Sequence, residues 1–281
     1  MAATRPSSTD DLTLDEVIAR LAGHDAVAGL LTIGSTGRAT LNPASDYDLV
    51  VILRRRPVPL TVGLTYVAGR LTDVVFVDLD EVRRIVEPAG AGAEAGPAIW
   101  GEQAVAAWLR GGQVVYDPTG LLGRGHDIVA ARPEAAAGDA EVYSAWFSIN
   151  YNLVQNRRML ASDDTAYLTG LDVRLLYCLS DMWWHYFTLR SLAVRGEKAQ
   201  VRYLAEHDPE YLAQFRTCLA QSDRTLRFRA YEALAGLTVA PAGGLWPARA
   251  TAIQPHTGPG WASDRIEKAQ AFWAELCSCE E

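Results

Sequence analysis

The sequence predicts an α+β protein in which a mixed β-sheet flanked by helices is followed by an all-α helical bundle. Short apolar runs bounded by Gly, Pro or charged residues, which are typical of strands, are concentrated before residue 118. Beyond that point apolar residues recur every three or four positions, which is typical of helices with one buried face. We therefore predict two domains, residues 1–118 and 119–281.

Strand and helix signals are interleaved in the first domain. The turn-like pair Ala68-Gly69 joins two apolar runs directly, which favours a mixed sheet over a long series of β-α-β units. The segment Pro88–Pro97 is a low-complexity loop. We predict helices at Thr13–Ala22, Asp80–Glu87 and Ala98–Arg110, and strands at Val27–Ile33, Tyr47–Leu53, Leu60–Val67, Leu71–Val77 and Gln113–Tyr116.

The second domain shows only helical patterns. The boundary falls near Pro118–Arg132, to which we assign no helix or strand, and the Pro- and Gly-rich segment Ala240–Ser263 is expected to be a surface loop. We predict helices at Glu141–Leu160, Tyr167–Val194, Gln200–Glu206, Glu210–Ala220, Arg224–Ala235 and Asp264–Leu276.

The net charge indicates which kind of molecule the protein binds. The 281 residues include 26 Lys+Arg and 34 Asp+Glu, a formal net charge of −8, and no basic run is longer than Arg54-Arg55-Arg56. Proteins that wrap nucleic acid need basic side chains clustered on one face, so we expect a small-molecule partner instead. The N-terminus has no apolar signal segment and no stretch is long enough to span a bilayer, so we expect a cytoplasmic protein without a membrane partner.

One segment carries the pattern expected of a metal site. An apolar strand ends at Gly34-Ser35, and a polar loop then leads to Asp46 and Asp48 at the start of the next strand. Residues two apart on a strand point to the same side, which places these carboxylates a few ångströms from each other. Such like charges need a positive partner, and Mg²⁺ with oxygen ligands is the usual one. A third carboxylate is expected on a neighbouring strand, with Asp73 as first choice, followed by Asp78 and Asp80.

The loop before the aspartates has features of a phosphate site. Gly34 allows close backbone approach, and consecutive N–H groups in such a turn can bind an anion. Ser35 adds a hydroxyl donor, and Arg38 can reach a polyphosphate oxygen. We expect this loop to hold a triphosphate tail beside the metal.

At these residues the sequence resembles the nucleotidyltransferase superfamily that includes DNA polymerase β. The signature of that superfamily is Gly-Ser, about ten residues, Asp-x-Asp in a strand and a later strand acid, here Gly34, Ser35, Asp46, Asp48 and Asp73. The length and the helical second half resemble the aminoglycoside nucleotidyltransferases within it. Many members carry a nucleotide-contacting Lys near a helix start in the second domain, and Lys198 occupies such a position.

The resemblance implies a reaction and its cofactors. A nucleoside monophosphate would pass from ATP or another NTP to a hydroxyl of a small molecule such as an aminoglycoside-like antibiotic, with release of pyrophosphate. Asp46, Asp48 and Asp73 would hold two Mg²⁺ ions, or Asp73 would instead act as general base. The alternatives are a nucleotide-binding regulatory or antitoxin-like module without turnover, and nucleotidylation of a protein or an RNA. The sequence leaves the oligomeric state open.

The helical half offers further candidates, each with a structural alternative. Trp183 and Trp184 are placed to stack on a ring or to lie in the core, and the structural role is the more common one. Asp181 and His185 form an acid and imidazole pair one turn apart. A cationic acceptor would need a separate acidic lining, for which the candidates are Asp163, Asp164, Asp172 and Asp181.

Overall fold

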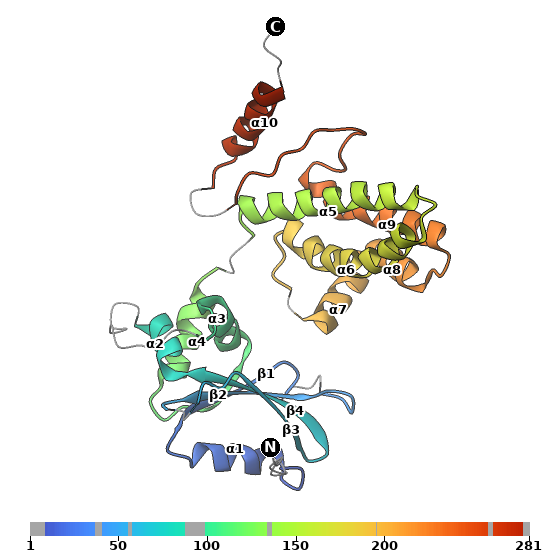
Figure 1. Cartoon of the computed structure of the whole chain (residues 1–281). Coiled ribbons are helices and arrows are strands. Elements are labelled where there is room, and N and C mark those ends of the chain that lie inside the picture. The colour runs from blue at the N-terminus through green and yellow to red at the C-terminus, as the bar shows by residue number, and fades with distance from the viewer. Residues whose placement is uncertain are drawn as a thin grey trace. The chain divides into compact units, whose positions relative to one another are not determined.

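The computed structural model describes residues 9–36, 41–55, 58–87, 99–133, 137–194, 196–257 and 261–277. Within it the chain forms two compact units, Met1–Pro133 and Glu134–Glu281. The first unit contains the sheet and the second is helical, so the protein has the α+β architecture that the sequence predicts (Figure 1).

The sheet of the first unit is mixed. Among the described residues five strands pair in the order β3-β4-β2-β1-β5, with β2 and β4 parallel and every other pair antiparallel. The hairpin β3–β4 brings β4 back alongside β2. The strands are β1 (Val27–Ile33), β2 (Tyr47–Leu53), β3 (Val62–Val67), β4 (Arg70–Asp78) and β5 (Gln113–Tyr116).

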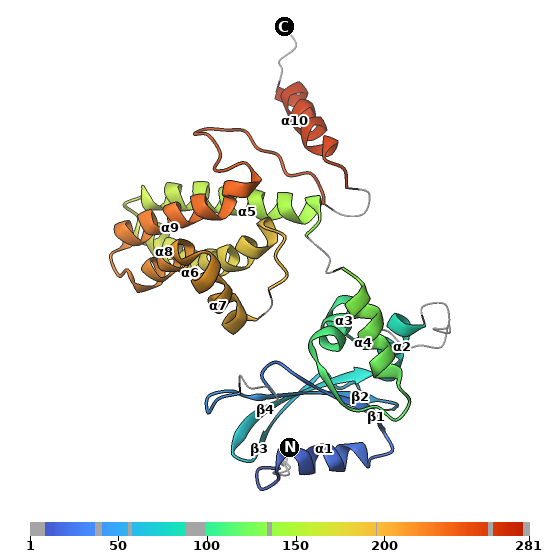
Figure 2. The same ribbon diagram turned by 180° about the vertical axis from the view of Figure 1, so that it is seen from behind.

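Helices cover both faces of the sheet. Helix α1 (Leu14–Ala22) lies against one face, and α2 (Leu79–Val86), α3 (Glu102–Gly111) and α4 (Leu121–Ala131) lie on the other (Figures 1 and 2). Successive strand residues point to opposite faces, so each strand contributes to both cores. Apolar side chains of α1 pack with Leu49 and Val67, whereas those of α2 to α4 pack with Leu31, Val50, Ile52 and Val77.

Helix α4 lies where we predicted no element. Its sequence contains two glycines, which weaken helix propensity, and Gly120 before it supplies no capping side chain. The Asp117 carboxylate instead accepts hydrogen bonds from the backbone N–H groups of Leu121 (3.0 Å) and Gly123 (2.9 Å). Because Leu122 and Val129 are buried against α2 and α3, the first unit extends to Pro133, beyond the boundary predicted at residue 118.

The second unit is built around two long helices. Helices α5 (Asp139–Leu160) and α6 (Thr165–Leu189) pack against each other, and α9 (Arg224–Val239) packs against both. The remaining elements are α7 (Glu197–His207), α8 (Pro209–Ala220), the short 3₁₀ helix η1 (Ala240–Ala242) and α10 (Asp264–Cys277). Helix α10 contains no buried residue, whereas α6 and α9 contribute most of their apolar side chains to the core.

The sequence predicts two segments to be loops. Residues 88–98, which include all of the predicted low-complexity loop, lie outside the described residues. The segment predicted as a loop after residue 240 begins with η1 and continues without helix or strand to residue 257. A search of the described helices finds none with the length and apolar content needed to cross a membrane.

Candidate active site

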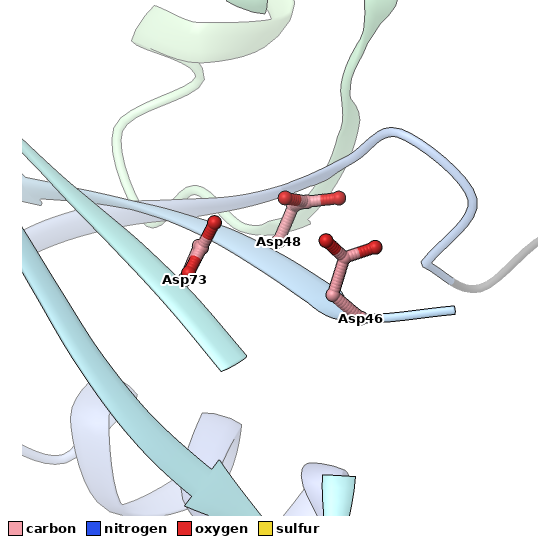
Figure 3. A group of neighbouring side chains, drawn as sticks. All are labelled: Asp46, Asp48 and Asp73. Carbon is pink, nitrogen blue, oxygen red and sulfur yellow. The ribbon is translucent and has the colours of Figure 1, made fainter. Parts of the chain in front are cut away.

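Three carboxylates converge on one face of the sheet. Asp46 lies directly before β2, Asp48 lies in β2, and Asp73 lies in β4. Each offers an oxygen atom, and these three atoms lie within 4.8 Å of one another (Figure 3). All three residues are half-buried. The structure therefore brings together the three acids that the sequence singled out, with Asp73 in the place that we assigned to it.

The strand register explains this convergence. Asp48 and Asp73 are direct partners across the parallel pair β2–β4, so their side chains leave the sheet on the same face. Asp46 precedes Asp48 by two residues and joins that face, although β2 begins only at Tyr47. Strand β2 has the bounds that the sequence predicts, and the position of Asp46 one residue before it does not change the grouping of the carboxylates.

Gly34 is required beside Asp48 for two reasons. It adopts a left-handed backbone conformation with φ +64°, which non-glycine residues rarely adopt. A Cβ atom at this position would lie only 2.4 Å from Oδ2 of Asp48. The absent side chain thus leaves space at the carboxylate, while Gly34, Ser35 and Thr36 form the turn that follows β1.

Thr36 contributes to the site although the sequence did not indicate it. Its buried hydroxyl accepts a hydrogen bond of 2.8 Å from the backbone N–H of Asp48, and its own N–H donates to the carbonyl of Ile33. These two contacts tie the Gly34-Ser35 turn to the strand that carries Asp48. Nothing in the sequence pattern identifies Thr36, because its partner lies twelve residues away.

Arg70 is a second site residue that the sequence did not indicate. Its guanidinium donates to the backbone carbonyl oxygens of Asn42 (2.7 Å) and Ser45, and it lies over the ring of Tyr47 at 5.1 Å. Residues 42–45 form the turn that leads into Asp46. Arg70 therefore fixes the segment that leads into Asp46, and it acts as a positioning residue.

The other predicted site residues lie elsewhere. Asp78 is the N-cap of α2, and Asp80 is ion-paired with Arg83 at 2.9 Å, so neither belongs to the carboxylate group. Arg38 lies outside the described residues. Lys198 is exposed in the first turn of α7, near a helix start as expected.

The helical unit contains a cavity of about 920 Å³. Its lining combines aromatic side chains, including Phe147, Tyr151 and Trp184, with His185. Burial lowers the pKa of His185, which Asp181 opposes only in part, so the imidazole is neutral near pH 7. Trp183 has a structural role instead: its indole N–H donates to Gln200 at 2.6 Å within the core.

Two of the four acidic candidates of the helical unit are engaged in contacts within that unit. Asp172 is ion-paired with Arg224 (2.6 Å) and Arg227, and Asp164 accepts a hydrogen bond from the backbone N–H of Ala166 at the start of α6. The Asp172 carboxylate therefore links α6 to α9, and the Asp164 carboxylate caps the start of α6. In the described residues the acidic group suited to a metal ion is that of Asp46, Asp48 and Asp73.

The donor set fits a hard divalent cation. Three carboxylates supply oxygen ligands of the kind that Mg²⁺ prefers, and their mutual repulsion favours a cation between them. The space that a Cβ of Gly34 would occupy lies beside Oδ2 of Asp48, so that oxygen is approachable from the turn. We conclude that Asp46, Asp48 and Asp73 are suited to hold Mg²⁺.

Comparison with known proteins adds little at the level of sequence. No family model and no curated protein matches the chain. Among solved structures, the chain is similar to the crystal structure of a nucleotidyltransferase-like protein from Exiguobacterium sibiricum 255-15. That match has 13% identity and a TM-score of 0.41, and it covers 82% of this chain and 75% of the other. Similarity at this level does not establish a family, so the function has to be inferred from the site.

Proposed function

We propose that the protein is a Mg²⁺-dependent nucleotidyltransferase. It transfers a nucleoside monophosphate, in the simplest case AMP from ATP, to a hydroxyl group of a small molecule and releases pyrophosphate. The observation that carries the proposal is the group of Asp46, Asp48 and Asp73, whose oxygen atoms lie within 4.8 Å of one another beside the glycine turn at Gly34. This arrangement combines a metal site with a neighbouring site for phosphate.

The proposed roles follow from the positions of the side chains. Asp46 and Asp48 hold the metal, which when bound supplies positive charge for the phosphate oxygens. The turn at Gly34 and Ser35 presents backbone N–H groups and a hydroxyl to the triphosphate. Arg38 and Lys198 are further proposed contacts of the nucleotide phosphates. Arg70 and Thr36 keep Asp46 and Asp48 in place through their backbone contacts.

The reaction is an in-line displacement at the α-phosphorus. The acceptor oxygen forms a new bond to that phosphorus as the bond to the bridging oxygen breaks, and pyrophosphate leaves with the electron pair. The acceptor proton passes to the Asp73 carboxylate if that residue is the general base, or to solvent if Asp73 completes the metal site. In both cases Asp73 lies on the side from which the acceptor hydroxyl approaches.

The acceptor is proposed to be a small hydroxylated molecule. The resemblance to aminoglycoside nucleotidyltransferases favours an antibiotic of that kind, whose modification in the cytoplasm would confer resistance. A net charge of −8 supports a partner other than nucleic acid, since binding to phosphate backbones relies on clustered basic residues.

The first test is pyrophosphate release from ATP and Mg²⁺ with a panel of hydroxylated acceptors, for wild type and Asp48→Asn. We expect the variant to lose at least about 100-fold in rate, since removal of one metal carboxylate weakens charge stabilisation in the transition state. Asp25→Asn is the matched control, because it removes the same charge from an exposed position in the same unit. Its rate should equal that of the wild type.

Two outcomes would replace the proposal. Saturable binding of ATP without pyrophosphate release from any acceptor would favour a regulatory nucleotide-binding module. Transfer of label from α-³²P-ATP into protein would favour a protein acceptor. Full activity of Asp48→Asn would show that the carboxylate group is not the catalytic site.

A further inference from the structure

We propose that Val62, Leu64, Tyr66 and Leu71 form the surface that binds the acceptor, and we call these four residues the apolar strip. The acceptor is then a hydroxylated molecule with an aromatic or alkyl face beside its reactive hydroxyl, in place of the aminoglycoside that the resemblance alone favours. This inference rests on the proposed function, because it takes the Asp73 carboxylate as the side at which the acceptor arrives.

The sheet register places the apolar strip beside the acids. Leu64 is the direct partner of Asp73 across the antiparallel pair β3–β4, and Tyr66 is the partner of Leu71. Directly paired residues share a face, and alternation along β3 adds Val62 to the same face. The strip therefore continues the surface that carries the three carboxylates.

The apolar strip is exposed, whereas apolar residues farther along this face are buried within the first unit. The side chains of Val62, Leu64 and Tyr66 are between 54% and 67% exposed, and Leu71 is 37% exposed. On the same face, Val50 and Val77 are buried under α2 to α4. Solvent-facing edge strands usually carry charged or polar side chains, so three exposed large apolar residues in alternation indicate a binding surface.

The order of the strands assigns this surface to the acceptor. The strand order is β3-β4-β2-β1. The Gly34-Ser35 turn follows the end of β1, most of the strip lies on β3, and Asp48 and Asp73 lie on the two strands between them. In the proposed reaction the turn holds the triphosphate, so pyrophosphate leaves toward β1. An in-line displacement requires the attacking oxygen on the opposite side, which is the side of β3.

The composition of the strip defines the class of acceptor. Residues 58–67 contain no charged side chain, so β3 adds no carboxylate to the group of Asp46, Asp48 and Asp73 for pairing with the ammonium groups of a polyamine sugar. Burial of an aromatic or alkyl face against Leu64 and Tyr66 is instead favourable through the hydrophobic effect. Asp73 at the edge of the strip is then positioned for the hydroxyl of the same molecule.

The test uses methyl NMR of the full chain labelled at Leu and Val, with Mg²⁺ and α,β-methylene-ATP to prevent transfer. The probes are 4-nitrophenyl β-D-glucopyranoside, which is neutral and has an aromatic face, and kanamycin, which is densely aminated. We expect the aryl glucoside to shift the methyl signals of Leu64, Leu71 and Val62, and kanamycin to leave them unchanged. Leu219, which is 62% exposed in α8, is the reference signal and should not respond.

Two variants test whether the strip contributes to the affinity for the aryl glucoside. Leu64→Ser should weaken binding of the aryl glucoside by about 10-fold, the size expected when a large apolar contact is lost. Leu219→Ser removes an equally exposed leucine far along the chain and should leave the affinity unchanged. Neither variant should alter the affinity for the Mg²⁺-nucleotide complex.

The outcomes separate this inference from the proposed function. Mn²⁺ in place of Mg²⁺ should broaden the Leu64 methyl signals, because the ion would lie at the neighbouring carboxylates. Broadening without a response to the aryl glucoside, or an equal response to kanamycin, overturns the apolar strip as acceptor surface and leaves the metal site intact. If the Leu64 methyl signals shift with protein concentration alone, a second copy of the chain occupies the strip, and the strip is then not the acceptor surface. Absence of broadening refutes the metal site, and the inference with it.

Discussion

At the scale of single residues, the site depends on contacts that a motif does not contain. Gly34, Ser35, Asp46, Asp48 and Asp73 could be selected from the sequence because they form a motif of Gly-Ser at a strand end, Asp-x-Asp about ten residues later and an acid in a following strand. Thr36 and Arg70 could not, since their roles come from a hydroxyl and a guanidinium that reach the backbone of a distant segment. Prediction from the sequence thus finds the carboxylates that converge and misses the side chains that hold their segments in place.

Gly34→Ala tests the close approach of the turn to Asp48. Gly69→Ala is the matched control, because Gly69 also has a positive φ (+72°) but a Cβ added there would have no atom within 4 Å. Each substitution should cost about 1 kcal/mol of folding free energy through the left-handed backbone. Only Gly34→Ala should displace the Asp48 carboxylate and weaken Mn²⁺ binding, by about 10-fold.

Urea unfolding and Mn²⁺ titration by electron paramagnetic resonance measure the two effects separately. Similar losses of stability with a selective loss of Mn²⁺ affinity in Gly34→Ala would support the geometry. Equal Mn²⁺ affinity in both variants would show that the turn does not shape the site.

At the scale of elements, strands and long helices followed from the sequence more closely than α4 did. The short apolar runs of β2 and β4 and the apolar stripe of α6 are strong local signals that tertiary packing reinforces. Helix α4 has weak propensity and is held by the Asp117 cap and by burial against α2 and α3. Such a helix exists because of its neighbours, so the local sequence pattern alone does not predict it.

The ion pairs between α6 and α9 give a pH-dependent prediction. The Arg224 guanidinium hydrogen-bonded to Asp172 holds the pKa of that carboxyl below its usual value. Because the folded pKa is depressed, the stabilisation is complete above the unfolded value of about 3.9 and is lost as the pH falls through the folded value. Asp172→Asn should therefore lower the free energy of unfolding by about 1 kcal/mol at pH 7.

Urea unfolding at pH 7 and at successively lower pH measures this effect, with Asp163→Asn as an exposed control. The difference between wild type and Asp172→Asn should shrink below about pH 4 as the wild-type carboxyl becomes protonated. A difference that persists unchanged at acid pH would show that packing, and not the charge, is responsible.

At the scale of the whole molecule, the chain divides into a proposed catalytic unit and a helical one. The sequence predicted both units and their order, while the boundary between them was displaced because α4 packs with the sheet unit. The overall charge of −8 bears on the class of partner, and the structure adds where part of that charge lies. Part of it gathers at Asp46, Asp48 and Asp73, and part of it is neutralised in ion pairs such as Asp172 with Arg224.

The central claim is that one group of carboxylates, among the 34 acidic residues of the chain, binds the catalytic cation. The most direct measurement is the anomalous difference map of crystals of the full chain grown with Mn²⁺ and α,β-methylene-ATP. We expect strong peaks between Asp46, Asp48 and Asp73, with the nucleotide phosphates toward the Gly34-Ser35 turn. Well-ordered crystals that show bound nucleotide but no anomalous peak at these three residues would contradict the claim.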